Sequence, residues 1–90
     1  MIQLTKEQQI VSFLRKTIAH LTETPSLEHE LGDDQLIQEV GMDSVRIIKL
    51  IVEIELNLEI AFDDDELLTE NFATLMVINK QINQKLGVSL

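Results

Sequence analysis

The chain has 90 residues, a formal net charge of −9 and 44% hydrophobic residues, with phenylalanine as its only aromatic residue type. This length gives one small domain with a thin core, which Leu, Ile and Val have to fill. The charge argues against nucleic-acid partners and anionic membranes, because affinity for both depends on Lys and Arg facing phosphates.

Cysteine is absent, which excludes disulfides and thiolate metal sites and fits a reducing cytoplasm. The only histidines, His20 and His29, lie nine residues apart without the spacing of a metal pair, so we expect both to face solvent and no metal site. The sequence also lacks a signal-peptide pattern and an apolar run of membrane-spanning length. These features predict a soluble, cytoplasmic protein.

The first predicted helix covers residues 6–21. Thr5 and Gln8 resemble a capping box at its start. Residues 22–43 contain the only proline, two of the three glycines and many acids, and are predicted as a long loop. A short helical turn is expected over residues 36–40. Five apolar residues suggest that the loop is pinned to the core: Leu27, Leu31, Leu36, Ile37 and Val40.

The second predicted helix runs from Ser44 to about Asn57, with Asp43 as its N-cap. Helical geometry places a core face at Ile47, Leu50, Ile51, Ile54 and Leu58. It places a water-facing strip at Arg46, Lys49, Glu53 and Asn57, where Lys49 and Glu53 have the spacing of a weak ion pair. A further apolar stripe consists of Val45, Val52 and Leu56. This stripe indicates either a central helix covered on several sides or a docking surface for partner proteins.

An acidic linker, "LEIAFDDDELLTEN", follows, with a short third helix expected at residues 64–68 and Leu67 or Leu68 turned inward. Its carboxylates lack the glycine and spacing of an EF-hand loop, which favours a solvated linker. The last helix is predicted to begin near Asn71 or Thr74 and to end before Gly87. Its buried stripe is expected to be Leu75, Ile78, Ile82 and Leu86. Together the elements predict an all-α fold, a small four-helix bundle with three long helices, a short third one and a single domain over residues 1–90.

Ser44 stands directly after Asp43 at the predicted start of the second helix. Helix capping is the ordinary role of a serine there, but Asp43 already offers a cap. A hydrolytic serine needs a base and oxyanion donors. The G-x-S-x-G elbow of serine hydrolases is absent, and a chain of this length has few residues with which to build a catalytic pocket, so we do not expect an enzyme. A modified serine needs exposure and a fixed position, which a helix start supplies, and a phosphodiester there would gain about 0.3–1 kcal/mol from the helix dipole. Gly41 would let the preceding loop turn sharply.

The segment "LIQEVGMDSVRIIKLIVEIE" closely resembles the attachment site of acyl and peptidyl carrier proteins. The family core is Gly-x-Asp-Ser followed by an aliphatic residue, matched here by residues 41–45, and the resemblance covers essentially the whole chain. It implies a four-helix bundle and 4'-phosphopantetheine on Ser44, transferred from coenzyme A by a magnesium-dependent phosphopantetheinyl transferase. Asp43 would cap the helix and be recognised by that enzyme. The chain would carry acyl groups as thioesters from a loading enzyme to downstream synthases or transferases, without catalysing the steps.

In the family, the positions of Val45, Val52 and Leu56 contact partner enzymes. Carriers of bacterial fatty acid synthesis are typically acidic on the exposed side of the second helix, where this chain has Arg46 and Lys49. Leu56 occupies a position often held by an acid. Asp63 replaces a proline that is common in the linker around the third helix. These departures favour a discrete carrier of a specialised pathway, polyketide or mixed polyketide and peptide assembly, in which Arg46 and Lys49 select the partner. A peptidyl carrier, a fatty acid carrier and an unmodified helical interaction module remain as alternatives. A methionine start and a short tail favour a free-standing chain, expected to be a monomer.

Overall fold

The computed structural model describes residues 6–87, within which the chain is helical and contains no strand. Its elements are α1 (Lys6–Leu21), α2 (Leu27–Glu30), η1 (Ile37–Val40), α3 (Ser44–Leu58), η2 (Asp64–Glu66), η3 (Thr69–Phe72) and α4 (Leu75–Leu86), where η marks a 3-10 helix. This confirms the all-α bundle with three long helices. The capping box expected at Thr5 and Gln8 lies outside the described residues.

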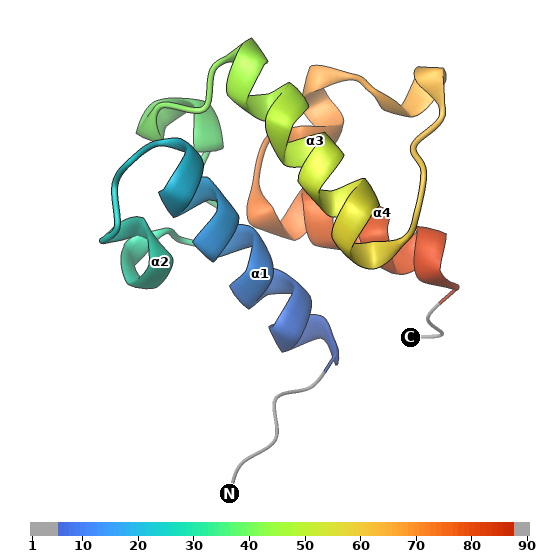
Figure 1. Cartoon of the computed structure of the whole chain (residues 1–90), viewed down its shortest axis with the longest axis horizontal. Helices are drawn as coiled ribbons and strands as arrows, with labels where there is room; N and C mark the ends of the chain where they lie inside the picture. The colour runs from blue at the N-terminus through green and yellow to red at the C-terminus, as the bar shows by residue number, and fades with distance from the viewer. Residues whose placement is uncertain (1–5, 88–90) are drawn as a thin grey trace, which may run out of the picture.

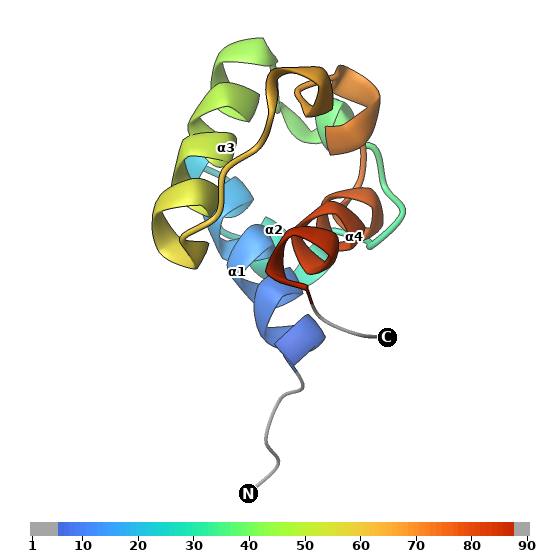
Figure 2. The ribbon, with the colours of Figure 1, turned by 90° about the vertical axis from the view of Figure 1, so that its right-hand side faces the viewer.

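The bundle is organised around α1, which contacts α2, α3 and α4. Figure 1 shows α1 and α3 running side by side in opposite directions. Figure 2 shows α3 and α4 on opposite sides of the bundle, joined by the connection that carries η2 and η3. The start of α3 therefore lies at one end of the molecule, next to the end of α1.

The core is mainly aliphatic, as the composition predicts. Two phenylalanines contribute to it: the rings of Phe62 and Phe72 meet edge to face with centroids 5.3 Å apart, a favourable aromatic geometry. Every long helix supplies side chains to this core, and so does η1. The side chains that are completely buried are Leu14, Ile18, Ile37, Met42, Leu50, Ile54, Leu75, Ile78 and Ile82.

The connection between α1 and α3 is more ordered than predicted. The helical turn expected at residues 36–40 is η1, but α2 was not expected, because four residues are too few to show a helical period. Leu27, Leu31 and Ile37 are buried and Val40 packs against the core. The expectation for Leu36 is wrong: it is 49% exposed, because its extended backbone turns the chain so that its neighbour Ile37 enters the core.

The connection between α3 and α4 also differs from the prediction. In place of one short helix at residues 64–68 there are two 3-10 helices, and Leu67 and Leu68 are exposed rather than turned inward. Phe62 and Phe72, at the two ends of this segment, take the buried positions. The prediction for the last helix is confirmed in its start, its end and three of its four stripe residues: Thr74 caps α4, Leu75, Ile78 and Ile82 are buried, and Gly87 ends the helix in the left-handed region. The fourth, Leu86, is only half-buried at the edge of the core.

Candidate attachment site at the start of α3

Ser44 is the first residue of α3, and its side chain is exposed. Asp43 is the N-cap: its carboxylate oxygen Oδ1 accepts a hydrogen bond from the Arg46 amide at 2.9 Å. The Ser44 hydroxyl is not needed for capping, and among the described residues it has no hydrogen-bond partner. The structure therefore fixes the backbone of Ser44 while leaving its hydroxyl open to solvent.

The loop before Ser44 is held by a turn and an anchor. Gly41 ends η1 with φ +104°, a left-handed conformation that favours glycine. A Cβ at Gly41 would meet Thr22 Cγ2 at an ordinary 3.7 Å, so the conformation, not crowding, requires glycine here. Met42 follows with its side chain fully buried and its amide bonded to the Ile37 carbonyl at 3.2 Å. Only Asp43 separates this anchor from Ser44.

Arg46 joins the start of α3 to the end of α1. Its Nε donates to the Leu21 carbonyl at 3.0 Å, and its Nη1 donates to Asp43 Oδ2 at 2.9 Å. The guanidinium thus binds the residue that precedes Ser44 and a backbone acceptor 25 residues away in sequence. The expectation that Arg46 faces water with Lys49 is wrong in this respect, because its side chain is half-buried and engaged in the fold.

The rest of the polar strip does face water. Lys49, Glu53 and Asn57 are exposed. The expected pairing of Lys49 with Glu53 is not found within the described part of the chain. Instead, Asn57 Nδ2 donates to the Glu53 carboxylate at 3.2 Å and to the Glu53 carbonyl at 2.8 Å. Lys49 is therefore the exposed cation of α3 that forms no ion pair within residues 6–87, whereas Arg46 is paired with Asp43.

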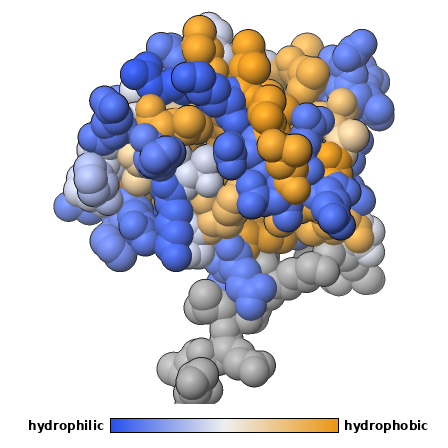
Figure 3. Space-filling view, viewed as in Figure 1, coloured by the Kyte–Doolittle hydropathy of each residue, from blue (hydrophilic) through white to orange (hydrophobic). Residues whose placement is uncertain are grey.

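The additional apolar stripe on α3 is exposed. Val45 is 61% exposed, Val52 45% and Leu56 71%, so the interpretation of this stripe as part of a central helix covered on several sides is wrong. Ile48, 61% exposed, belongs to the same stripe and was not predicted. Helical geometry could have found it, since Ile48 lies one turn before Val52. Figure 3 shows the resulting apolar ridge along α3. We call these four residues the α3 ridge.

The acidic linker is tied to α4 by an ion-pair cluster. The carboxylates of Asp63, Asp65 and Glu66 converge, with ligand oxygens within 4.8 Å of one another. Lys85 Nζ pairs with Glu66 and lies 3.7 Å from Asp63 Oδ2. The hydrogen bond from Lys85 lowers the pKa of Glu66, and the same bond raises the pKa of Lys85. The cluster holds η2 against the end of α4.

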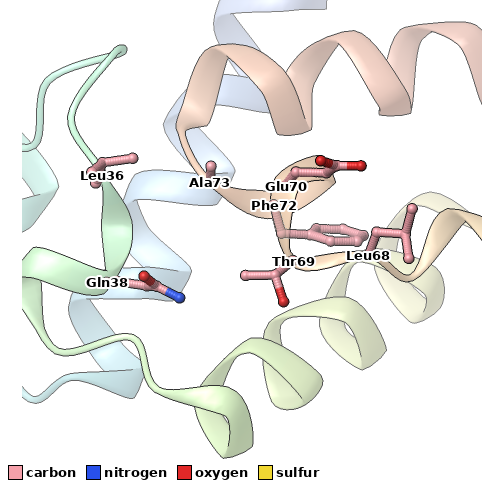
Figure 4. A pocket seen from close by; sticks show the side chains of 7 residues that line it. All are labelled: Leu36, Gln38, Leu68, Thr69, Glu70, Phe72 and Ala73. Carbon is pink, nitrogen blue, oxygen red and sulfur yellow. The ribbon is translucent and has the colours of Figure 1, made fainter.

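A surface hollow of about 530 Å³ separates η1 from η3. Leu36 and Gln38 line one side, as Figure 4 shows, and the other side is lined by Leu68, Thr69, Glu70, Phe72 and Ala73. The two sides are tied by the Ile37 amide, which donates to the Ala73 carbonyl at 2.9 Å. The lining combines apolar side chains with the polar groups of Gln38, Thr69 and Glu70. This hollow borders the segment that leads into Ser44.

The helical bundle and the open serine at a capped helix start define a protein suited to carry a covalently attached group. The model of the phosphopantetheine attachment site matches residues 12–75, which include Ser44. The chain belongs to this family of acyl and peptidyl carrier proteins, whose domain is the site of covalent 4'-phosphopantetheine attachment. It is thus a carrier protein that bears this arm.

Searches of curated proteins and of solved structures find no match to the chain. Among residues 6–87, no helix has the length and hydrophobicity needed to cross a membrane.

Proposed function

We propose that Ser44 is the residue that bears the arm and that the chain is a discrete acyl carrier of a specialised biosynthetic pathway. The observation that carries the assignment is the Ser44 hydroxyl, which is exposed on a backbone fixed by the Asp43 cap and the buried Met42. When attached, the arm supplies a thiol that holds an acyl group as a thioester. The role of the chain is to hold and present that group, and separate enzymes perform the chemistry.

The surroundings of Ser44 suit the negative charge of a phosphodiester. The first backbone amides of an α-helix such as α3 have no acceptor within the helix. They favour a negative charge at this end, and an exposed anion there is stabilised by about 0.3–1 kcal/mol. The neighbouring Asp43 carboxylate would repel this anion if it were unpaired. Arg46 offsets that repulsion, because its guanidinium binds Asp43 at 2.9 Å. In this proposal Asp43 also contributes to recognition by the phosphopantetheinyl transferase.

The α3 ridge and Lys49 are the proposed docking surface for partner enzymes. Four exposed apolar side chains in a row are typical of a contact surface on a small protein. The partners are the transferase, an acyl-loading enzyme and downstream synthase or transferase enzymes. The sequence suggested that Arg46 and Lys49 together select the partner enzyme by charge. Because Arg46 binds Asp43 and the Leu21 carbonyl within the fold, this role is assigned to Lys49.

Polyketide assembly, or mixed polyketide and peptide assembly, is the proposed pathway class. The proposal is supported by the exposed side of α3, which presents the α3 ridge and Lys49. Carriers of bacterial fatty acid synthesis typically have acidic residues on this side. The carrier is proposed to act as a cytoplasmic monomer. A peptidyl carrier is the second candidate, since the same attachment site serves aminoacyl cargo. Incubation of the carrier with each class of loading enzyme distinguishes the two by the mass of the thioester formed.

The assignment of Ser44 is tested by intact mass spectrometry. The wild-type chain, incubated with coenzyme A, Mg²⁺ and a phosphopantetheinyl transferase, is expected to gain the mass of one arm. Ser44→Ala is expected to gain nothing, and Ser26→Ala, which removes another exposed serine, keeps the full gain. Modification of Ser44→Ala would contradict the assignment. An unmodified wild-type chain that still binds a partner would favour a plain interaction module, and turnover by the chain alone would favour an enzyme.

A further inference from the structure

Lys49 presents an open amine on the same helix as Ser44. Its side chain is exposed, and it forms no ion pair with a carboxylate between residues 6 and 87. Ser44 and Lys49 lie five residues apart on α3, which is about 7.5 Å along the helix axis. Because one helix holds both residues, a flexible arm on Ser44 would keep its cargo close to the Lys49 amine.

The other lysine side chains that the structure describes have different surroundings. Lys80 and Lys85 belong to α4, which Figure 2 shows on the opposite side of the bundle from α3. Lys85 pairs with Glu66, and this hydrogen bond raises the pKa of Lys85, which holds its amine in the charged, unreactive form. Lys16 is exposed but belongs to α1, so an arm on α3 has to cross to another helix to reach it. Of these lysines, Lys49 alone shares a helix with the attachment site.

A groove of about 500 Å³ between α1 and α3 runs past Lys49. The exposed side chains of Ile48 and Val52 supply apolar surface to its lining. The ionisable side chains that line the groove with Lys49 are Lys16, His20 and Glu53. These groups do not share one sign of charge, whereas Ile48 and Val52 favour contact with an aliphatic group. An aliphatic acyl group in contact with them would lie beside the Lys49 amine.

We propose that Lys49 is a self-acylation site that takes the carried acyl group from the arm on Ser44. The neutral Lys49 amine attacks the carbonyl carbon of the thioester, and a C–N bond forms as the C–S bond breaks. The proton lost by the nitrogen passes through solvent to the released sulfur. Thioester and amine thus give an amide and a free thiol, with no further reactant. The inference rests on the proposed function, because it needs the arm on Ser44.

The transfer alters the surface on which the proposed partner selection depends. Acylation removes the positive charge of Lys49, the cation to which that selection is assigned. An amide is also far less reactive than a thioester, so the acyl group is no longer available to downstream enzymes. A carrier that stays loaded without meeting a partner would in this way withdraw its cargo and change its own docking surface.

The test starts from wild-type carrier with a hexanoyl arm, installed from hexanoyl-coenzyme A by a phosphopantetheinyl transferase. Excess hexanoyl-coenzyme A is removed, the carrier is incubated at mildly alkaline pH, and hydroxylamine then cleaves the remaining thioesters but leaves amides. Tandem mass spectrometry of the digest locates hexanoyl-lysine. Lys49 is expected to carry at least about tenfold more hexanoyl than Lys80, because the tether raises the local concentration of thioester. Equal amounts on Lys49 and Lys80, or most of the hexanoyl on Lys16, would overturn the proposal.

Three variants separate the amine from the groove. Lys49→Arg keeps the charge but replaces the amine with a guanidinium that stays protonated, so it is expected to lose the hexanoyl-lysine. Lys80→Arg is the matched control, because it makes the same change at another exposed lysine, and it is expected to behave as wild type. Ile48→Ser combined with Val52→Ser removes apolar lining and is expected to slow the transfer at least about threefold. Unchanged hexanoyl-lysine in Lys49→Arg, or an unchanged rate in the double serine variant, would contradict the proposal.

Two further controls establish that the arm delivers the acyl group. Ser44→Ala, incubated with hexanoyl-coenzyme A in solution, is expected to show no preference for Lys49 over Lys80. In the wild type, the rate constant is expected to be independent of carrier concentration, because the transfer takes place within one chain. A preference for Lys49 in Ser44→Ala, or a rate constant that rises with carrier concentration, would overturn the inference.

The intact mass of the loaded carrier is measured before the incubation. A carrier that bears the hexanoyl arm but leaves Lys49 unmodified contradicts this inference and leaves the proposed function standing. A chain that accepts no arm on Ser44 contradicts both.

Discussion

Replacing Arg46 with methionine tests whether this side chain holds the start of α3 in place. The hydrogen bond from Nε to the Leu21 carbonyl involves a charged donor, which contributes about 1.5–3 kcal/mol when water cannot replace it. The Arg46 side chain is 40% exposed, so water would replace part of that bond. The ion pair with Asp43 joins two partly exposed side chains and adds about 0–1 kcal/mol. Arg46→Met is therefore expected to lower the free energy of unfolding by about 1–2 kcal/mol.

Urea unfolding measures this loss, and amide hydrogen exchange shows where it acts. Exchange is expected to accelerate at Arg46 and Ile47 in the first turn of α3, whose amides donate to Asp43, while α4 changes little. Arg46→Lys keeps the charge but loses the planar fork that reaches two acceptors, so it recovers only part of the stability. A double-mutant cycle with Asp43→Asn, which retains a capping oxygen, is expected to give a coupling of about 0.5–1 kcal/mol. An unchanged urea midpoint in Arg46→Met, or a coupling of zero, would refute the reasoning.

Four further variants test other parts of the fold. Lys85→Met removes the donor that lowers the pKa of Glu66, so an NMR titration is expected to show that pKa rising. The pKa of Glu66 is lower in the folded chain than in the unfolded chain, so the Glu66–Lys85 pair stabilises the fold fully at pH values above the ordinary pKa of glutamate. The difference in free energy of unfolding between wild type and Lys85→Met therefore disappears as the pH falls through the folded pKa of Glu66. Ile54→Ala leaves a cavity in the core and is expected to cost about 2–5 kcal/mol in urea unfolding, whereas Leu56→Ala on the α3 ridge costs less than about 0.5 kcal/mol. Equal costs would contradict the assigned faces of α3. Thr74→Ala, which removes the side-chain cap of α4, is expected to lower the free energy of unfolding, measured in urea, by about 1 kcal/mol.

The regular helices were predictable because their apolar periods are long. The sequence placed the start of α3 correctly, and its predicted core face includes the fully buried Leu50 and Ile54. The capping role of Asp43 followed from its position before an uninterrupted helical stretch. The same period also contained Ile48, which the prediction overlooked although its place on the α3 ridge follows from geometry alone.

Features that depend on tertiary contacts were not predictable. The partner of Arg46 is a backbone carbonyl at the end of α1, and no local pattern connects two positions 25 residues apart. In the second connection, Phe62 and Phe72 displaced Leu67 and Leu68 from the core, a competition that side-chain packing decides. The short helix α2 has too few residues to show a period.

The central claim is that one open hydroxyl at the entrance of α3 bears the arm. The most direct measurement digests the fully modified wild-type carrier and locates the added phosphopantetheine by tandem mass spectrometry. We predict one arm per chain, found on the peptide that contains Ser44 and fragmenting at that residue. An arm located on any other residue, or a chain that competent transferases leave unmodified, would contradict the account.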